Sequence, residues 1–338
     1  PENPRPPALK LHDLQCIKAL GQGEYGQVLL VRTHRNLHPL DRVGCLFAMK
    51  VLRKKIIRYQ DEVGENPSHK KDVERSILAD LPWSPFVNGI IQTFHDSRNL
   101  YLMLEFIPCG TLHSLIRNRA PFDPATTAFY FSNIVCGLNF LENNDIIHRD
   151  IKPDNILVGQ DGYLCLADFG SAARGSEEND WLMVGTPLYM APELFSPQGQ
   201  SERVYTGVDW WSSGCVLYEM ITRRMPFYGQ NQSSTFKKAL AGKIVWSPTV
   251  RVGRTLKSLV AGLLTVDAAQ RLGTQGVSDV MDHPWLKDVN WAKLRARQYL
   301  VCPFHADLSF PSRSIMCSGS IRSAPVTRHG NMAQTSSP

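Results

Sequence analysis

The stretch GQGEYGQVLLVR, residues 21–32, carries three glycines at the spacing G-x-G-x-x-G, which unrelated kinds of nucleotide-binding site share. In a dinucleotide-binding fold the glycines follow a strand and open a helix. Here the residues after the last glycine, QVLLVR, are rich in branched apolar side chains, and the run CIKAL precedes the first glycine. The stretch therefore favours a strand–turn–strand hairpin, whose glycines let backbone N–H groups approach phosphates. A glycine triplet alone is equally compatible with an ordinary loop.

The composition is that of a globular protein. The chain has 338 residues, of which 43% are hydrophobic, enough for one large domain or two smaller ones. No apolar run is long enough to span a membrane, and the N-terminus lacks the apolar core of a signal peptide, so we expect a cytoplasmic protein. The net charge is +6, but apolar residues interrupt basic runs such as RKKIIR, which favours a solvated helix face over nucleic-acid binding.

Eight cysteines are scattered along the chain without a C-x-x-C pair. This distribution argues against a zinc site and against a disulfide framework. We expect reduced, mostly buried thiols.

The apolar pattern divides the chain into two lobes of an α+β fold. Residues 11–106 contain five short runs that predict strands, LQCIKAL, QVLLVR, CLFAMKVL, IIQTFHD and LYLMLEF, and one helical segment, SHKKDVERSILADL. After a hinge at about residues 105–110, amphipathic segments predict a larger helical lobe over residues 107–290, where Asp123 can cap a helix that starts at Pro124. Residues 1–10 form an extension, residues 291–310 a further segment, and the Ser-rich residues 311–338 an expected mobile tail.

Motifs downstream of the glycines make the triplet informative. Lys50 lies on a predicted strand, and Glu74 lies on the helix that follows and can hold this lysine by an ion pair. HRDIKPDN follows at residues 148–155, DFG at 168–170 and APE at 191–193. In order and spacing these motifs resemble the signature set of protein kinases. The resemblance implies the bilobal protein kinase fold, with a small β-rich lobe and a larger α-helical lobe.

Phosphoryl transfer mainly requires in-line positioning and neutralisation of phosphate charge, and the motif residues suit this chemistry. Asp150 is the candidate that orients the substrate hydroxyl and accepts its proton, and Lys152 would neutralise the transferring phosphate. Asn155 and Asp168 offer hard oxygen ligands for Mg²⁺. The expected cofactors are ATP and Mg²⁺.

The resemblance also implies further contacts with ATP. The loop over the phosphates comprises Gly21, Gln22, Gly23, Glu24, Tyr25 and Gly26. Adenine is expected to pack on Val28, Ala48 and Leu157, with Leu104 as gatekeeper and hinge contacts around Glu105 and Ile107. Four residues fall where kinases stack a regulatory apolar spine, with an ordinary core as the alternative: His148, Phe169, Leu78 and Ile90.

Finer resemblances indicate the residue type that accepts the phosphate and the kinase group to which the sequence is similar. DIKPDN and GTPLYMAPE, with Lys152 and Thr186, resemble serine/threonine kinases. Residues 11–310 resemble the AGC group, since WAKLRARQYLVCPFHADL is similar to the start of its C-terminal tail. DFGSAAR, VGTPLYMAPE and VDWWSSGCVLYEMI are similar to the myotonic dystrophy kinase, Rho-kinase and citron kinase branch. The resemblance also assigns structural roles to Asp209, which buttresses the catalytic loop, and to an Arg271–Glu193 pair.

Protein substrates with basic residues upstream of the acceptor are expected. Asp154 and Glu219 lie where basic-directed AGC kinases carry carboxylates that meet arginines. Thr111 and Leu188 replace usual acidic residues, so the preference should be weaker than in the strongest examples. The alternatives are a catalytically weak pseudokinase or scaffold and a small-molecule kinase. The catalytic motif residues argue against the first, and the complete APE segment with Asp209 argues against the second.

The loop SAARGSEENDWLMVGTP departs from the common kinase pattern. Many kinases order this loop by a phosphate that pairs with the HRD arginine, here Arg149. Leu182 stands at the usual AGC phosphosite, and Ser176 lies too early to align with it. The nearby acids Glu177, Glu178 and Asp180 could supply fixed negative charge or form a solvated turn. We predict a loop that is competent without activating phosphorylation; no F-x-x-F motif follows Phe310 that would suggest a tail switch.

Overall fold

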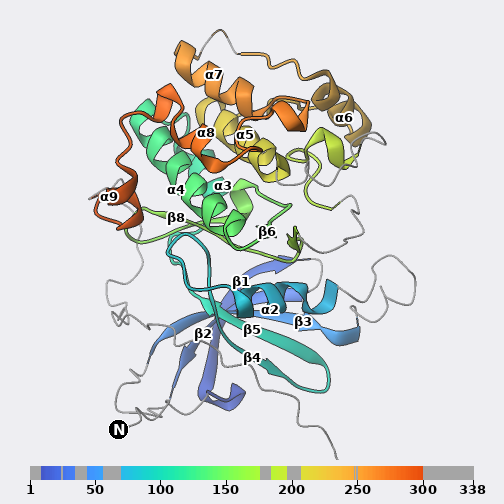
Figure 1. Ribbon diagram of the computed structural model, residues 1–338. Helices are drawn as coiled ribbons and strands as arrows, with labels where there is room; N and C mark the ends of the chain where they lie inside the picture. Colours follow the sequence, from blue (N-terminus) through green and yellow to red (C-terminus); the bar gives the residue numbers. More distant parts are fainter. Residues whose placement is uncertain are drawn as a thin grey trace, which may run out of the picture.

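The computed structural model describes residues 9–23, 26–34, 44–55, 70–175, 184–195, 207–246, 248 and 250–299. These residues form a small lobe built on a β-sheet and a larger lobe built mainly of helices, which lie one above the other in Figure 1. The α+β class and the two-lobed architecture predicted from the sequence are therefore confirmed.

An antiparallel five-stranded sheet forms the small lobe, in the order β1-β2-β3-β5-β4. Its strands are β1 (Leu14–Gly23), β2 (Gly26–Thr33), β3 (Leu46–Arg53), β4 (Ile90–His95) and β5 (Asn99–Glu105), and each corresponds to one predicted run. The predicted helix is α2 (Lys70–Asp80). Its Ile77 and Leu78 are buried in the same apolar cluster as Leu102 and Leu104 of β5, which fixes the helix against the sheet.

The glycine triplet forms the tight end of a hairpin. β1 ends at Gly23, β2 begins at Gly26, and these two glycines pair with each other. A Cβ on Gly26 would lie 1.8 Å from the carbonyl oxygen of Val51, so the close approach of β3 requires glycine here. The predicted hairpin is confirmed, and the strand-to-helix turn of a dinucleotide-binding fold is excluded.

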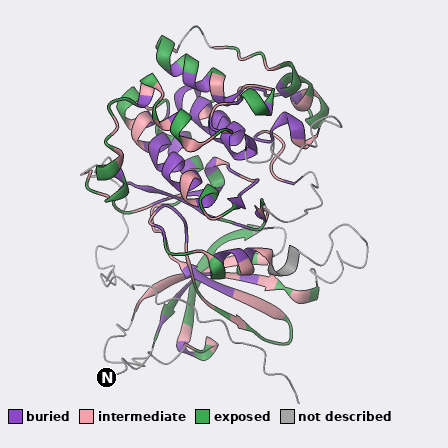
Figure 2. Cartoon of the chain, viewed as in Figure 1, coloured by how far each residue is buried: buried purple, intermediate pink, exposed green. Residues whose placement is uncertain are grey.

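Helix α4 (Pro124–Glu142) is largely buried within the large lobe (Figure 2). It begins as predicted, because the Asp123 carboxylate accepts hydrogen bonds from the N–H groups of Ala125 at 2.9 Å and Thr126 at 3.0 Å. Helix α5 (Gly207–Thr222) is buried along almost its whole length. The other α-helices in the described part of the chain are α3 (Leu112–Arg119), α6 (Gln232–Ala241), α7 (Arg254–Leu263), α8 (Val277–Met281) and α9 (Trp291–Arg295).

Two pairs of short antiparallel strands hold the motif loops on the side of the large lobe that faces the small lobe (Figure 1). β6 (Ile146–Ile147) pairs with β9 (Ala173–Arg174), and β7 (Ile156–Val158) pairs with β8 (Leu164–Leu166). HRD follows β6 directly, and DFG lies between β8 and β9. The strand pairing therefore brings these two motifs together.

The segment after α9 is anchored to the large lobe. The Arg297 guanidinium binds the Asp161 carboxylate at 3.0 Å, and the Tyr299 N–H donates to the Tyr163 hydroxyl at 3.0 Å. Arg297 also donates to the Pro85 carbonyl in the loop after α2. This segment therefore connects the large lobe to the loop that follows α2.

The described cysteines fit the prediction only in part. Cys136, Cys165 and Cys215 are free and buried, whereas Cys16 is exposed. Cys45 is disulfide-bonded, so the expectation of reduced thiols is wrong at this position. A disulfide forms by oxidation of two thiols that folding has brought close together, and sequence spacing does not reveal this proximity.

Among the residues described, none of the helices combines the length and apolar character needed to cross a membrane.

Candidate active site

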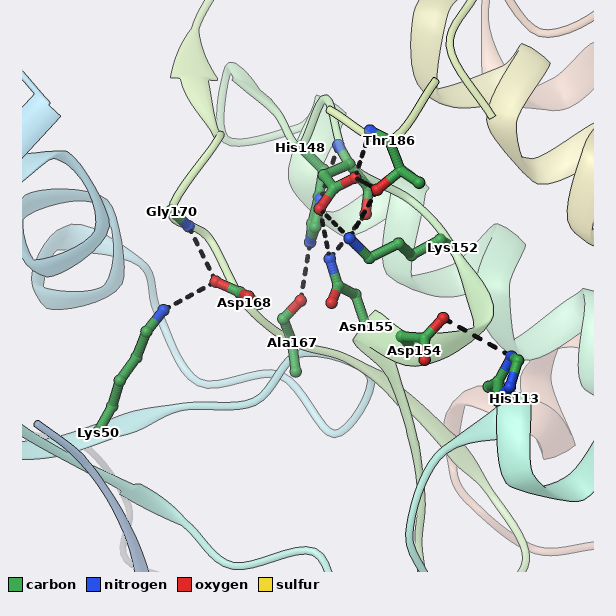
Figure 3. A network of polar contacts seen from close by, with 11 residues as sticks. Lys50, His113, His148, Lys152, Asp154, Asn155, Ala167, Asp168, Gly170 and Thr186 are labelled. Atoms are coloured by element: carbon green, nitrogen blue, oxygen red, sulfur yellow. Dashed lines mark hydrogen bonds and ion pairs between the residues drawn. The ribbon is translucent and has the colours of Figure 1, made fainter. Parts of the chain in front are cut away.

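Lys50 on β3 lies between two carboxylates from different parts of the chain. Its ammonium group donates to both oxygens of Glu74 on α2, at 2.8 and 2.7 Å. It also donates to Oδ1 of Asp168 in the DFG motif at 2.8 Å (Figure 3). The predicted lysine–glutamate ion pair is therefore formed, and it extends to Asp168.

The charges of this group follow from competition between burial and Coulomb attraction. Burial by itself lowers the pKa of Lys50, but the attraction of Glu74 and Asp168 outweighs it and raises this pKa above its ordinary value. For Asp168, burial is likewise outweighed by the attraction of Lys50, and its pKa falls below the ordinary value. Burial raises the pKa of Glu74 despite the attraction of Lys50. Lys50 therefore stays cationic and Asp168 anionic at neutral pH.

Asp150 is the centre of a second polar network. Its Oδ2 accepts from the Lys152 ammonium at 2.7 Å and from the Asn155 amide at 2.9 Å. Its Oδ1 accepts from the Thr186 hydroxyl at 2.8 Å and from the Thr186 N–H at 3.0 Å. The Thr186 hydroxyl also accepts from Lys152 at 2.7 Å (Figure 3). A carboxylate held in this way can receive a proton at a fixed position.

Asp209 at the start of α5 holds the backbone of the HRD loop. It accepts from the N–H groups of His148 at 2.7 Å and Arg149 at 2.8 Å, as the predicted buttress requires. Arg149 has a φ of 64°, in the left-handed region that residues other than glycine rarely adopt. The buried rings of His148 and Phe169 lie 4.9 Å apart. The HRD and DFG loops therefore share one buried core.

The predicted adenine contacts come from the small lobe and from β7. Ala48 pairs with Leu104 across β3 and β5, and both are buried in one apolar cluster on which Val28 and Ile90 also pack. Leu157 lies on β7. β5 ends at Glu105, and Ile107 follows in the connection to α3.

Phosphate-loop residues are described only in part. Gly21, Gln22 and Gly23 lie on β1, and Gly26 starts β2. Glu24 and Tyr25 lie outside the described residues. The same is true of Ser176, Leu182 and the acids between them.

Several contacts of the site are not indicated by any sequence motif. The sequence motifs associate Thr186 only with serine/threonine specificity. In the structure its hydroxyl donates to Asp150 and accepts from Lys152. Trp83 donates to the Glu105 carboxylate at 3.3 Å, beside the hinge. Tyr189 donates to the Glu219 carboxylate at 2.7 Å. No local pattern indicates these pairs, because their members are at least 22 residues apart.

The donor set suits a magnesium–phosphate complex better than an all-protein metal site. Within the described ranges, no cluster of three His, Cys, Asp or Glu side chains could hold a metal ion. Magnesium usually takes one or two protein oxygens and fills its remaining positions with water and phosphate oxygens. An amide oxygen from Asn155 and the half-exposed Asp168 carboxylate fit this requirement.

Comparison with known proteins identifies the family. The model of the protein kinase domain matches residues 14–286. The human protein named cAMP-dependent protein kinase catalytic subunit PRKX is 34% identical over 88% of this chain and 78% of its own length. Protein kinase 2 of Dictyostelium discoideum is 35% identical over 85% of this chain and 56% of its own length. The Saccharomyces cerevisiae serine/threonine-protein kinase YPK2/YKR2 is 33% identical over 86% of this chain and 41% of its own length. The chain therefore belongs to the protein kinase family, as a protein serine/threonine kinase with relatives of the AGC type.

Proposed function

We propose that Asp150 is the base of this kinase and that the Lys50–Glu74–Asp168 group positions the phosphates of ATP. The substrate hydroxyl gives its proton to Asp150, its oxygen bonds the γ-phosphorus, and the bond from that phosphorus to the departing ADP breaks. Lys152, bound to Asp150 at 2.7 Å, carries the positive charge that faces the transferring group. The observation that best supports the proposal is the network in which Lys152, Asn155 and Thr186 fix the Asp150 carboxylate.

Asn155 and Asp168 would hold Mg²⁺, which when bound neutralises phosphate charge. Lys50 is kept straight by Glu74 and is ready to meet the α- and β-phosphates. We assign adenine to the space beside Val28, Ala48, Leu104 and Leu157, and the hinge to residues 105–110. Residues 11–106 and 107–290 are then the two lobes.

The direct test is transfer from ATP and Mg²⁺ to Ser- and Thr-containing peptides, measured together with nucleotide binding. We expect transfer to both hydroxyl types and none to tyrosine. Binding of nucleotide without transfer would identify the scaffold alternative instead.

We further propose that Asp154 and Glu219 select substrates with upstream arginine. The charge of Asp154 repels that of the Glu219 carboxylate, and His113 Nδ1 lies 3.7 Å from Oδ2 of Asp154. Burial raises the pKa of Glu219, and the Tyr189 hydrogen bond only partly offsets this effect. The ionised form that attracts arginine is therefore lost at a higher pH than for an ordinary glutamate.

Peptide kinetics test this preference. The ratio of kcat/KM for upstream-Arg over upstream-Ala peptides should fall by at least about tenfold in Glu219→Gln, because one charge-assisted pair is worth about 1.5–3 kcal/mol. In the wild type the same ratio should fall as the pH is lowered, and the fall should begin at a higher pH than an ordinary glutamate would give, since protonation removes the Glu219 charge. A wild-type ratio close to one at every pH tested would contradict the proposal.

We also propose that the loop after DFG is competent without phosphorylation. Contacts of two arginines support this proposal. The Arg149 guanidinium donates to the Ser171 carbonyl at 2.5 Å and to the Ala172 carbonyl at 3.3 Å. Arg174 pairs with Asp80 at the end of α2 at 2.6 Å, which ties the loop to the helix that carries Glu74. Phosphatase treatment followed by intact-mass measurement should leave turnover unchanged. A large loss that tracks removal of phosphate from Ser176 or Thr186 would contradict the proposal.

Within the AGC relatives, we propose the myotonic dystrophy kinase, Rho-kinase and citron kinase branch. DFGSAAR and VGTPLYMAPE support this placement. A phylogeny that groups the chain with cAMP-dependent kinases would contradict it.

A further inference from the structure

The segment from α6 through α7 concentrates positive charge. Residues 232–266 contain six cations and no Asp or Glu, so the rest of the chain has a formal net charge of zero. All six side chains are exposed: Lys237, Lys238, Lys243, Arg251, Arg254 and Lys257. A surface with this composition attracts anionic partners over a distance of about 10 Å at moderate salt.

An open pocket with both apolar and charged walls lies within this segment. Its volume is about 490 Å³, and Trp246, Pro248, Val250, Val252 and Gly253 line it together with Arg251 and Lys257. The Lys257 ammonium lies 5.7 Å from the centre of the Trp246 ring. The pocket thus combines a cavity large enough for one or two side chains with two exposed cations.

The wall of the pocket is fixed from behind by α5. The Tyr218 ring lies 5.0 Å from the Trp246 ring, and the Tyr218 hydroxyl donates to the Val245 carbonyl at 2.6 Å. Tyr218 itself is buried. Leu240 and Val245, which are 45% and 64% exposed, add apolar surface in the same segment. A preformed pocket of this kind loses little entropy when a partner binds.

We propose that this α6–α7 surface docks an acidic segment of a protein partner. One apolar side chain of that segment enters the pocket beside Trp246, while its Asp or Glu residues pair with Arg251 and Lys257. Charge complementarity selects an acidic partner, and the apolar surface that Trp246, Val250 and Val252 give this open pocket can accept one apolar side chain. Binding of single-stranded nucleic acid would require a row of aromatic rings, whereas the residues that line this pocket include one. A flat bilayer offers no side chain to fill the cavity.

The location leaves the active site free. α6 and α7 lie toward the end of the large lobe that is remote from the small lobe, whereas HRD and DFG lie where the lobes meet (Figure 1). A partner held on the α6–α7 surface could therefore be bound while another segment is phosphorylated. Binding to the α6–α7 surface can be measured without turnover. Failure of docking and failure of the proposed catalytic roles are therefore distinguishable.

The experiment uses three pools of fluorescein-labelled peptides and the full chain. The first pool has one Leu, Phe or Trp flanked by Asp and Glu, the second has Asn and Gln in place of the acids, and the third has Gly in place of the apolar residue. Fluorescence anisotropy measures binding to the wild type, to Arg251→Glu/Lys257→Glu, and to the control Lys287→Glu/Lys293→Glu. Both control positions are exposed cations outside the α6–α7 surface.

We expect the first pool to bind best and to lose at least about tenfold in affinity in Arg251→Glu/Lys257→Glu, since each reversed charge now repels the peptide. The control should lose less than about twofold apart from the general effect of net charge. Turnover of a short Ser/Thr peptide should be equal in all three proteins. Equal binding of the acidic and neutral pools, or equal losses in both double variants, would overturn the proposal. So would capture of phosphatidylserine vesicles or single-stranded RNA by this surface without binding of the acidic pool.

Discussion

Asp150 and Asp168 are both carboxylates of motif loops, but their surroundings differ. Asp150 accepts hydrogen bonds from Lys152, Asn155 and Thr186, and its side chain is only 13% exposed. Asp168 pairs with Lys50, and half of its side chain is exposed. The first environment suits a fixed proton acceptor, and the second leaves a carboxylate edge accessible to a ligand.

Replacing each aspartate by asparagine should separate these roles. Asp150→Asn should lower kcat by at least about a thousandfold, or about 4 kcal/mol, because the amide cannot accept the hydroxyl proton, while nucleotide affinity stays nearly unchanged. Asp168→Asn should weaken Mg²⁺–nucleotide binding as well. Peptide phosphorylation and calorimetric titration measure the two quantities, with the exposed Asp288→Asn as control. Wild-type turnover in Asp150→Asn would refute the assignment.

At the scale of elements, the hairpin of β1 and β2 contains glycines with opposite steric surroundings. A Cβ on Gly26 would lie 1.8 Å from the Val51 carbonyl oxygen in β3, whereas a Cβ on Gly21 would have no atom of the described residues beyond its chain neighbours within 4 Å. Gly26 is therefore required by the packing of the sheet. The packing of the described residues does not require glycine at position 21. We therefore expect this glycine to matter for nucleotide binding.

Alanine substitutions should distinguish the two positions. Gly26→Ala should destabilise the protein by about 2–4 kcal/mol, because β2 and β3 must move apart. Gly21→Ala should change stability by less than about 0.5 kcal/mol while weakening nucleotide binding. Thermal unfolding without nucleotide, followed by nucleotide titration, measures both effects. Equal shifts in unfolding temperature for the two variants would contradict this account.

At the scale of the whole molecule, a buried ion pair joins the APE motif to the region after α7. Arg271 is 1% exposed and binds the two oxygens of Glu193 at 2.6 and 2.8 Å, as the resemblance implied. It also donates to the carbonyls of Gly207 and Thr265, at 2.8 and 3.0 Å. One guanidinium thus holds together segments far apart in the sequence.

Arg271→Met should lower the free energy of unfolding by about 3–5 kcal/mol, because Glu193 is left buried without its cation. Replacing both partners by apolar residues should recover part of this loss. Asp80→Ala, which breaks the exposed pair with Arg174, is the control and should cost less than about 1 kcal/mol. Denaturant unfolding measures all three variants. Similar losses for Arg271→Met and Asp80→Ala would show that burial does not govern the cost.

Features encoded by neighbouring residues could be predicted from the sequence. The branched-apolar runs indicated all five strands of the small lobe, Asp123 and Pro124 indicated the start of α4, and the residues around the glycines indicated a hairpin. These patterns are local, since a cap or a strand depends on residues a few positions apart. The kinase motifs added the lysine–glutamate pair, which the structure contains.

Tertiary structure alone decided the contacts between distant residues that no motif indicates. Thr186 reaches Asp150 across 36 positions, Tyr189 reaches Glu219 across 30, and Arg174 reaches Asp80 across 94. The disulfide at Cys45 and the pocket beside Trp246 belong to the same class. Such contacts depend on how whole elements pack, and many packings are compatible with one local pattern of caps and apolar residues. The sequence therefore determined the elements and the motif residues, whereas the arrangement of the elements determined what surrounds each of these residues.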